Sequence, residues 1–228
     1  MKEFTFDIST YSKYLFFPEE RVKSKIRIIR ILLEASRYIL SNSKVDKEKY
    51  AGEIRLVIDK MSRIFFVSDE KIFSIVFPFK LNEVEFETET EFEMEDRFEL
   101  SYTNNINVNS VLISKAIATI DCDDFSNTCV IDFADHVDFF EDKNEDGNLW
   151  FFLKELMLFE DGYIRYDYDL KGYNEACKKG RPHKHPLHHY DLFYTNKATF
   201  KIGLDSEINT EKFIELLNVK EDCYFLRK

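Results

Sequence analysis

The chain of 228 residues is 44% hydrophobic and 16% aromatic and has a formal net charge of −11, which suits one domain with a large core. The low count of 6 glycines and 4 prolines argues against long disordered segments, and no apolar run approaches the roughly 20 residues that a membrane helix needs. Residues 1–10 lack the apolar centre of a signal peptide and the 4 cysteines form no CxxC pair, so we expect a cytoplasmic protein with free thiols and no membrane contact.

The charge is unevenly distributed along the chain. Residues 1–80 hold 16 Lys and Arg against 11 Asp and Glu, whereas residues 81–228 hold 16 against 32. Because an acidic surface repels a nucleic-acid backbone, any contact with nucleic acid requires a local basic patch.

Residues 1–70 are predicted to form a mainly helical element. Pro18, followed by two glutamates, opens a first helix with an apolar stripe at helical spacing that ends near Ser41. A second helix is predicted from about Asp46, with a stripe from Tyr50 to Ile64. The two helices would pack on a sheet as a hairpin. A basic row on the first helix is either a solvated face or a phosphate site; it comprises Lys23, Arg27, Arg30 and Arg37.

Residues 71–204 are predicted to form the sheet, and its clearest strand is Glu83–Glu95. Seven glutamates alternate there with mostly apolar residues, which is the pattern of a strand with one buried and one wet face. The acidic face either keeps the protein soluble and blunts edge pairing, or it docks a basic partner protein or mimics nucleic acid. Further short strands are predicted at 111–120, 129–133, 137–140 and 150–159, and a terminal helix at 210–217 within residues 205–228.

Residues 160–204 gather the versatile side chains of the chain. After a turn at Asp161-Gly162, alternation over residues 163–170 places Arg165, Asp167 and Asp169 on one face of a strand. A loop is predicted over residues 171–187, followed by a hairpin of residues 188–194 and 198–204. His189 and Asp191 share a face of its first arm, so pairing between adjacent strands could bring Asp167 near His189.

Three interpretations of this stretch remain open. In the first, His183, His185 and His188 bind a divalent transition metal, with Asp167 or Asp191 as a possible further ligand; otherwise no cofactor is expected. In the second, His188 or His189 transfers protons while Arg165 and Lys201 stabilise an anionic transition state, and a basic loop holds a nucleic-acid backbone. That loop includes Lys178, Lys179, Arg181 and Lys184. In the third, the histidines and carboxylates pair across the sheet and are structural.

The last third of the chain also resembles known families. The order Arg165-Tyr166-Asp167-Tyr168-Asp169, then His185-Pro186-x-x-His189, then a strand and a terminal helix resembles bacterial proteins classed only as a domain of unknown function. It is also similar to small toxin ribonucleases whose His-rich loop precedes a last strand and helix. This resemblance implies a bacterial stress or phage-defence setting, with Asp167, His185 and His189 at the matching positions.

These observations predict a single α+β domain: a two-helix amino-terminal element on a curved, mostly antiparallel sheet, with a carboxy-terminal helix. The predicted function is an RNA- or nucleotide-directed phosphodiesterase centred on His185, His188, His189, Arg165 and Asp167. The alternative is a non-enzymatic interaction subunit whose acidic face at Glu83–Glu95 docks a basic partner.

Overall fold

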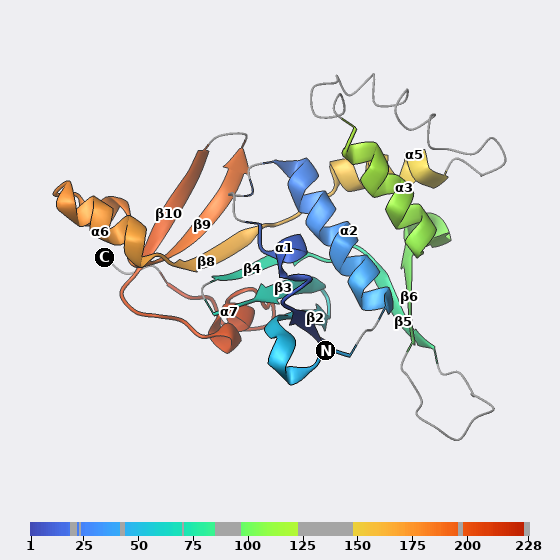
Figure 1. Cartoon of the computed structure of the whole chain (residues 1–228), viewed down its shortest axis with the longest axis horizontal. Coiled ribbons are helices and arrows are strands. Elements are labelled where there is room, and N and C mark those ends of the chain that lie inside the picture. The colour runs from blue at the N-terminus through green and yellow to red at the C-terminus, as the bar shows by residue number, and fades with distance from the viewer. Residues whose placement is uncertain are drawn as a thin grey trace. The chain divides into compact units, whose positions relative to one another are not determined.

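The structure, a computed structural model, describes residues 1–18, 22, 24–41, 44–69, 71–84, 97–122, 148–195 and 198–225. The fold is α+β, as predicted (Figure 1). The chain divides into two compact units: a first unit of residues Met1–Ser24, Val45–Phe77 and Asp161–Lys228, and a second unit of residues Lys25–Lys44 and Pro78–Glu160. No helix within the described ranges is long and apolar enough to cross a bilayer.

The first unit is built on a seven-stranded, wholly antiparallel sheet in the order β1-β2-β3-β4-β8-β9-β10. β4 and β8 are neighbours although the second unit's residues 78–160 separate them in the chain. The strands are β1 Lys2–Ser9, β2 Tyr50–Ile58, β3 Arg63–Val67, β4 Lys71–Val76, β8 Ile164–Tyr168, β9 His188–Thr195 and β10 Ala198–Leu204. The other elements are α1 Lys13–Phe16, η1 Lys47–Lys49, α6 Leu170–Lys178, η3 Pro182–Lys184 and α7 Thr210–Leu216.

One face of this sheet changes character across its width. The register aligns one residue from each strand in a single row. From β1 to β10 that row is Phe6, Ile54, Phe66, Phe73, Arg165, Asp191 and Lys201. Its members on β1–β4 are buried apolar side chains, whereas its members on β8–β10 are charged. The charged residues therefore extend the same face that carries the apolar core.

The opposite face is covered by the short helix α7. Phe213 of α7 is fully buried and lies edge-on to Phe65, with ring centroids 6.1 Å apart, and 6.0 Å from the ring of Tyr190. It joins a cluster of buried side chains from β2, β3, β4 and β8. That cluster comprises Val57, Phe65, Ile72, Ile164 and Tyr166. The predicted terminal helix is confirmed, and it holds the sheet from the side opposite to the charged residues.

The second unit contains three helices and a small antiparallel sheet among its described residues. They are α2 Lys25–Ser41, α3 Ser110–Ile120, α5 Asn148–Leu158 and strands β5 Lys80–Val84, β6 Arg97–Tyr102 and β7 Ile106–Asn107, with η2 Thr103–Asn105 between the last two. The predicted first helix is confirmed as α2, which ends at Ser41 as expected, but it begins at Lys25 rather than near Pro18, and Glu19 and Glu20 lie outside the described residues. In its basic row, Arg30 pairs with Asp121 and Arg37 pairs with Glu34.

Two segments of the second unit that were predicted as strands are helices. Residues 111–120 belong to α3, which begins because the Asn109 side chain accepts hydrogen bonds from the amides of Val111 and Leu112. Residues 150–158 belong to α5, whose buried residues recur at helical spacing. These residues are Leu149, Phe152, Leu153 and Leu156. In both segments a dense apolar run hid the helical period.

The predicted second helix from Asp46 is wrong, because the segment forms β2 and β3. Its apolar residues fit a helical stripe, but Ile54 and Leu56 also alternate with polar neighbours and both are fully buried. Gly52 distinguishes the strand from the helix. Its φ is 145°, and a Cβ there would lie 2.5 Å from the Val67 carbonyl oxygen. Only glycine allows β3 to approach β2 so closely.

Other predictions for the sheet have mixed outcomes. The arms at residues 188–194 and 198–204 are confirmed as β9 and β10. The predicted loop at 171–187 instead contains α6 and η3. Residues 163–170 contain β8, but β8 pairs with β4 and β9, so Asp161-Gly162 is no hairpin turn. Of the acidic strand, Glu83 lies in β5, whereas residues 85–95 lie outside the described residues, as do 129–133 and 137–140.

Replacing Gly52 by Ala tests the strand assignment, because a helix and a strand at this position predict changes in stability of opposite sign. In a helix, the exchange would stabilise the protein by about 1 kcal/mol. At a φ of 145° and against the Val67 carbonyl, we expect it to destabilise the protein by at least about 1 to 2 kcal/mol. Gly180→Ala is the control, since φ there is also positive but nothing lies within 4 Å of an added Cβ. Urea unfolding of the three proteins measures the difference; a stabilised Gly52→Ala would contradict the strand.

Candidate functional site

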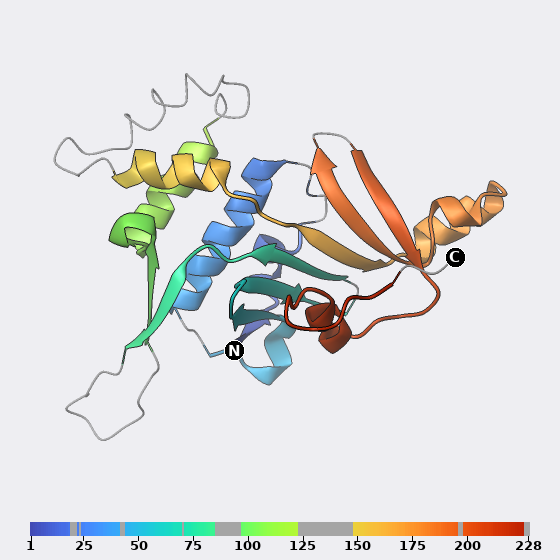
Figure 2. The ribbon, with the colours of Figure 1, turned by 180° about the vertical axis from the view of Figure 1, so that it is seen from behind.

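Five of the candidate side chains meet where β8, β9 and β10 lie side by side (Figure 2). Arg165 on β8 is directly opposite Asp191 on β9, which is opposite Lys201 on β10. Asp167 is directly opposite His189. Paired residues of adjacent strands point to the same face, so these five residues form one cluster, which we call the buried charge network. The predicted proximity of Asp167 and His189 is thus confirmed.

Two positive and two negative side chains balance one another in this network. Arg165 Nη2 donates to Asp167 Oδ2 and to Asp191 Oδ2, each at 2.6 Å. Lys201 Nζ donates to the other oxygen of Asp191 at 2.7 Å. The side chain of Asp191 is fully buried, and those of Arg165 and Asp167 are 8% and 11% exposed. Burial would raise the pKa of Asp191, but the hydrogen bond and charge of Lys201, followed by Arg165, keep that pKa below its ordinary value.

His189 is neutral at neutral pH and has a defined tautomer. Its Nδ1 lies 2.8 Å from the carbonyl oxygen of Pro186, which can only accept, so Nδ1 carries the proton. Its Nε2 then accepts from Lys201 Nζ at 2.6 Å. Burial and then the positive charge of Lys201 lower the pKa of His189, despite the two carboxylates nearby. Because the ring is fully buried and both nitrogens are bonded, it offers no free atom to a substrate.

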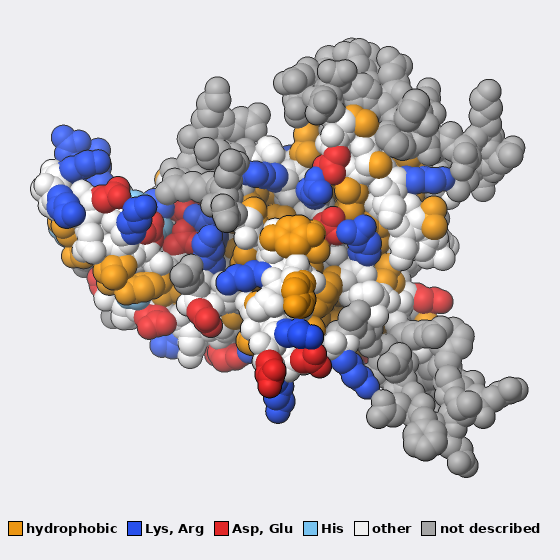
Figure 3. Space-filling view, in the orientation of Figure 1, with side chains coloured by type: hydrophobic (Ala, Val, Ile, Leu, Met, Phe, Trp, Pro, Cys, Tyr) orange, Lys and Arg blue, Asp and Glu red, His pale blue; other side chains and the backbone are white. Residues whose placement is uncertain are grey.

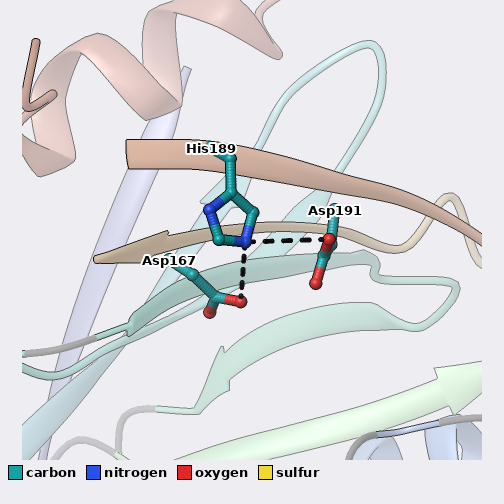
Figure 4. Close-up of side chains that lie close together, drawn as sticks. All are labelled: Asp167, His189 and Asp191. Carbon is teal, nitrogen blue, oxygen red and sulfur yellow. Dashed lines mark ion pairs between the residues drawn. The ribbon is translucent and has the colours of Figure 1, made fainter. Parts of the chain in front are cut away.

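Asp167, His189 and Asp191 also have the composition of a metal site. One ligand atom from each can be chosen so that all three lie within 4.8 Å of one another, the only such group in the part of the chain that is described. Figure 4 shows the His189 ring pointing to both carboxylates, with Nε2 3.7 Å from Asp167 and 3.9 Å from Asp191. However, the Lys201 ammonium group already lies 2.6 Å from Nε2 and 2.7 Å from Asp191. The protein's own cation thus takes the place of a metal ion.

A second site begins where β8 ends. Asp169 caps α6 by accepting from the Gly172 amide at 2.7 Å, and its other oxygen lies 2.7 Å from His185 Nε2. Burial would raise the pKa of Asp169, but these two hydrogen bonds and the nearby histidines keep it below its ordinary value. Gly172 makes the contact possible, since a Cβ there would lie 2.4 Å from His185 Nε2. The His185 side chain remains 19% exposed.

This pair lines an open pocket of about 560 Å³ between α6 and η3. Four basic side chains line it together with Asp169, His185 and Glu175; they are Lys171, Lys179, Arg181 and Lys184. All four are exposed, and Figure 3 shows Lys and Arg side chains gathered over α6 at the left edge, with acidic side chains among them. We call this the α6 pocket. It combines local positive charge with an accessible imidazole in an otherwise acidic part of the chain.

The structure separates the remaining predicted residues. His188 points to the opposite face of the sheet, where its Nδ1 bonds the Tyr166 hydroxyl at 2.9 Å. His183 is exposed on η3. His183, His185 and His188 are therefore not brought together as one ligand set. Lys178 is exposed at the end of α6 but does not line the α6 pocket, unlike Lys179.

Sequence reasoning missed the partner of His185. The alternation places Asp169 on the strand face of Arg165 and Asp167, and Lys171 is predicted in a loop. In the structure Asp169 is the N-cap residue of α6 and Lys171 lies in its first turn. The available signal was Asp169-x-x-Gly172, because Asp favours the position before a helix and accepts from amides in its first turn. Comparison with protein-family models, curated proteins and solved structures finds no match to this chain.

Asp191→Asn tests whether the buried charge network stabilises the fold. The exchange keeps the shape but removes the negative charge that Arg165 and Lys201 share. Arg165 then keeps only Asp167, and Lys201 loses its ion pair with Asp191, so we expect a loss of about 3 to 5 kcal/mol. Asp205→Asn is the control, since Asp205 is exposed beyond β10 and should cost less than about 0.5 kcal/mol. Chemical denaturation measures both. An Asp191→Asn protein as stable as the control would show that the network does not contribute to stability.

Proposed function

We propose that the chain is an RNA- or nucleotide-directed phosphodiesterase whose site is the α6 pocket. The proposal rests on one observation: the partly exposed His185, paired with Asp169 at 2.7 Å, lines a pocket together with four basic side chains. This assigns proton transfer to His185 rather than to His189, which is fully buried. The similarity of the last third to toxin ribonucleases supports RNA as the substrate and a bacterial stress or phage-defence setting.

The geometry of His185 suits general acid–base catalysis. When His185 is neutral, Asp169 accepts the hydrogen of Nε2, which leaves the lone pair on Nδ1. No described residue bonds Nδ1. In the proposed reaction Nδ1 takes the proton of an attacking hydroxyl group while the hydroxyl oxygen bonds to phosphorus, and the carboxylate of Asp169 stabilises the imidazolium that forms. The phosphorus–oxygen bond to the leaving nucleoside breaks, the leaving oxygen takes a proton from water, and the imidazolium returns its proton to solvent. This is the division of roles between an imidazole and an orienting carboxylate that recurs in hydrolytic sites.

The basic side chains would bind the phosphate and the charge that develops on it. Arg181 presents a planar fork that matches two phosphate oxygens, whereas the three lysines act as mobile point charges. Lys171 and Lys179 lie eight residues apart at the two ends of α6, a separation of about 12 Å along a helix axis. Cations at that spacing can contact more than one phosphate group. The pocket volume lies in the range of about 300 to 1,000 Å³ typical of small-ligand sites.

His185→Ala tests the catalytic assignment. Removing the imidazole should lower the cleavage rate of total RNA at neutral pH by about a hundredfold or more. His183→Ala is the matched control: it lies two residues earlier, is exposed and does not line the pocket, so its rate should match the wild type. Thermal melts of both proteins check the fold. Cleavage by His185→Ala at the wild-type rate would remove His185 from the mechanism.

Lys179→Ala tests phosphate binding separately from chemistry. Measured by fluorescence anisotropy in the His185→Ala background, the affinity for single-stranded RNA should fall. The slope of log K against log salt should become shallower by about 0.7. Lys178→Ala removes the same charge one residue away, outside the pocket, and should leave both quantities nearly unchanged. Equal effects of the two substitutions would mean that RNA binds to a general basic surface rather than in the α6 pocket.

A further inference from the structure

The buried charge network and the α6 pocket are joined by a short chain of contacts. His189 Nδ1–H donates to the Pro186 carbonyl, and Pro186 directly follows His185 in the sequence. The rings of His185 and His189 also contact edge to face, with centroids 5.1 Å apart. The buried His189 thus contacts the partly exposed His185 and holds the backbone next to it.

The same segment is fixed at two further points. The Asp169 amide donates to the Leu187 carbonyl at 3.0 Å, which joins the start of α6 to the residue before β9. Gly203 of β10 lies so close to the Pro186 ring that an added Cβ would be 2.8 Å from Pro186 Cγ. Residues 185–187 lie in the loop between η3 and β9, but these contacts with the start of α6 and with β10 fix their position.

We propose that His189 is a positioning residue that holds Pro186, and through it His185, within reach of Asp169. This role of His189 goes beyond the proposed function, because it concerns the position of His185 in the structure. Only the expected effect of His189 on the rate of RNA cleavage rests on the proposed function.

The buried charge network explains why His189 can keep its hydrogen bond to the Pro186 carbonyl. A neutral imidazole has one proton, and it must be on Nδ1 to bond Pro186. Lys201 donates into Nε2 and so excludes the other tautomer, and Asp191 keeps the ammonium group in place. Asp191 is in turn held by Arg165. The buried charges thus keep the proton of His189 on Nδ1. Because Nδ1–H donates to Pro186, this tautomer fixes the position of the backbone beside His185.

His189→Leu and His189→Asn form a pair that separates positioning from simple filling of space. The two side chains have similar size, but only the Asn amide can donate to Pro186 from about the position of Nδ1. The first readout is the nitrogen-detected NMR signal of the His185 ring, which reports its bond to Asp169 without any need for substrate. We expect His189→Leu to lose the hydrogen-bonded His185 Nε2–H signal and His189→Asn to retain it. His188→Leu, on the other face of the sheet, should retain it too.

The second readout is the kinetics of RNA cleavage. Because a catalytic group displaced by about an ångström loses much of its effect, His189→Leu should lower kcat about tenfold or more. KM should change less than twofold, since the basic side chains are untouched, and His189→Asn should restore most of kcat. A folded His189→Leu protein with the wild-type His185 signal would overturn the inference, and so would an Asn variant that behaves like Leu.

Gly203→Ala decides the question if His189→Leu does not fold. The added methyl group would displace the Pro186 ring from the side of β10 without changing any buried charge. Because Gly203 is exposed, we expect the variant to fold. We expect the same loss of the His185 signal; an unchanged signal in this variant would overturn the inference. The two proposals fail separately. Wild-type cleavage by His185→Ala would refute the proposed function, whereas the NMR signal of His185 still decides the role of His189.

Discussion

The arrangement of the first unit depends on a single buried carboxylate. Asp191 accepts from Arg165 with one oxygen and from Lys201 with the other, and its side chain is fully buried. A carboxylate in that position costs several kcal/mol to desolvate, and only paired cations with good geometry compensate for the cost. The three residues come from three adjacent strands, so their pairing also sets the register of β8, β9 and β10. A slip of one residue would move every charge to the opposite face, against the core cluster under α7.

The position of these charges on the sheet explains why two sites lie so close together. The row that includes Asp191 is apolar on β1–β4 and charged on β8–β10, so the charged part begins where the hydrophobic core ends. Beyond it, β8 leads directly into α6 and its cap at Asp169. The buried His189 near the start of β9 and the partly exposed His185 before it therefore lie in contact, with their rings edge to face. One oxygen of Asp167 is buried and has no hydrogen-bond partner among the described residues.

Sequence reasoning worked where the pattern had only one explanation. Alternation over residues 188–194 and 198–204, together with a short polar turn, admits a hairpin and little else, and it correctly placed His189 and Asp191 on one face. It failed where one pattern fits two structures. Tyr50, Ile54, Val57, Met61 and Ile64 satisfy a helical stripe, yet the segment forms two strands because tertiary pairing with β1 and β4 overrides a weak local preference. Residues 111–120 and 150–159 show the reverse error, since a nearly continuous apolar run does not reveal its period.

Burial is the property that the sequence could not supply, and it determines which histidine can do chemistry. His185, His188 and His189 look alike in the sequence, but their surroundings give them different capacities. His188 bonds a tyrosine hydroxyl on the far face, His189 is enclosed with both nitrogens bonded, and His185 keeps one nitrogen unbonded by the described residues beside a basic pocket. A proton-transfer group must reach solvent or substrate, whereas a group that locates the backbone is most effective when it is buried and held in one tautomer. In the proposed site the two histidines would have different roles: His189, which is buried, would fix the geometry, and His185, which is partly exposed, would exchange protons.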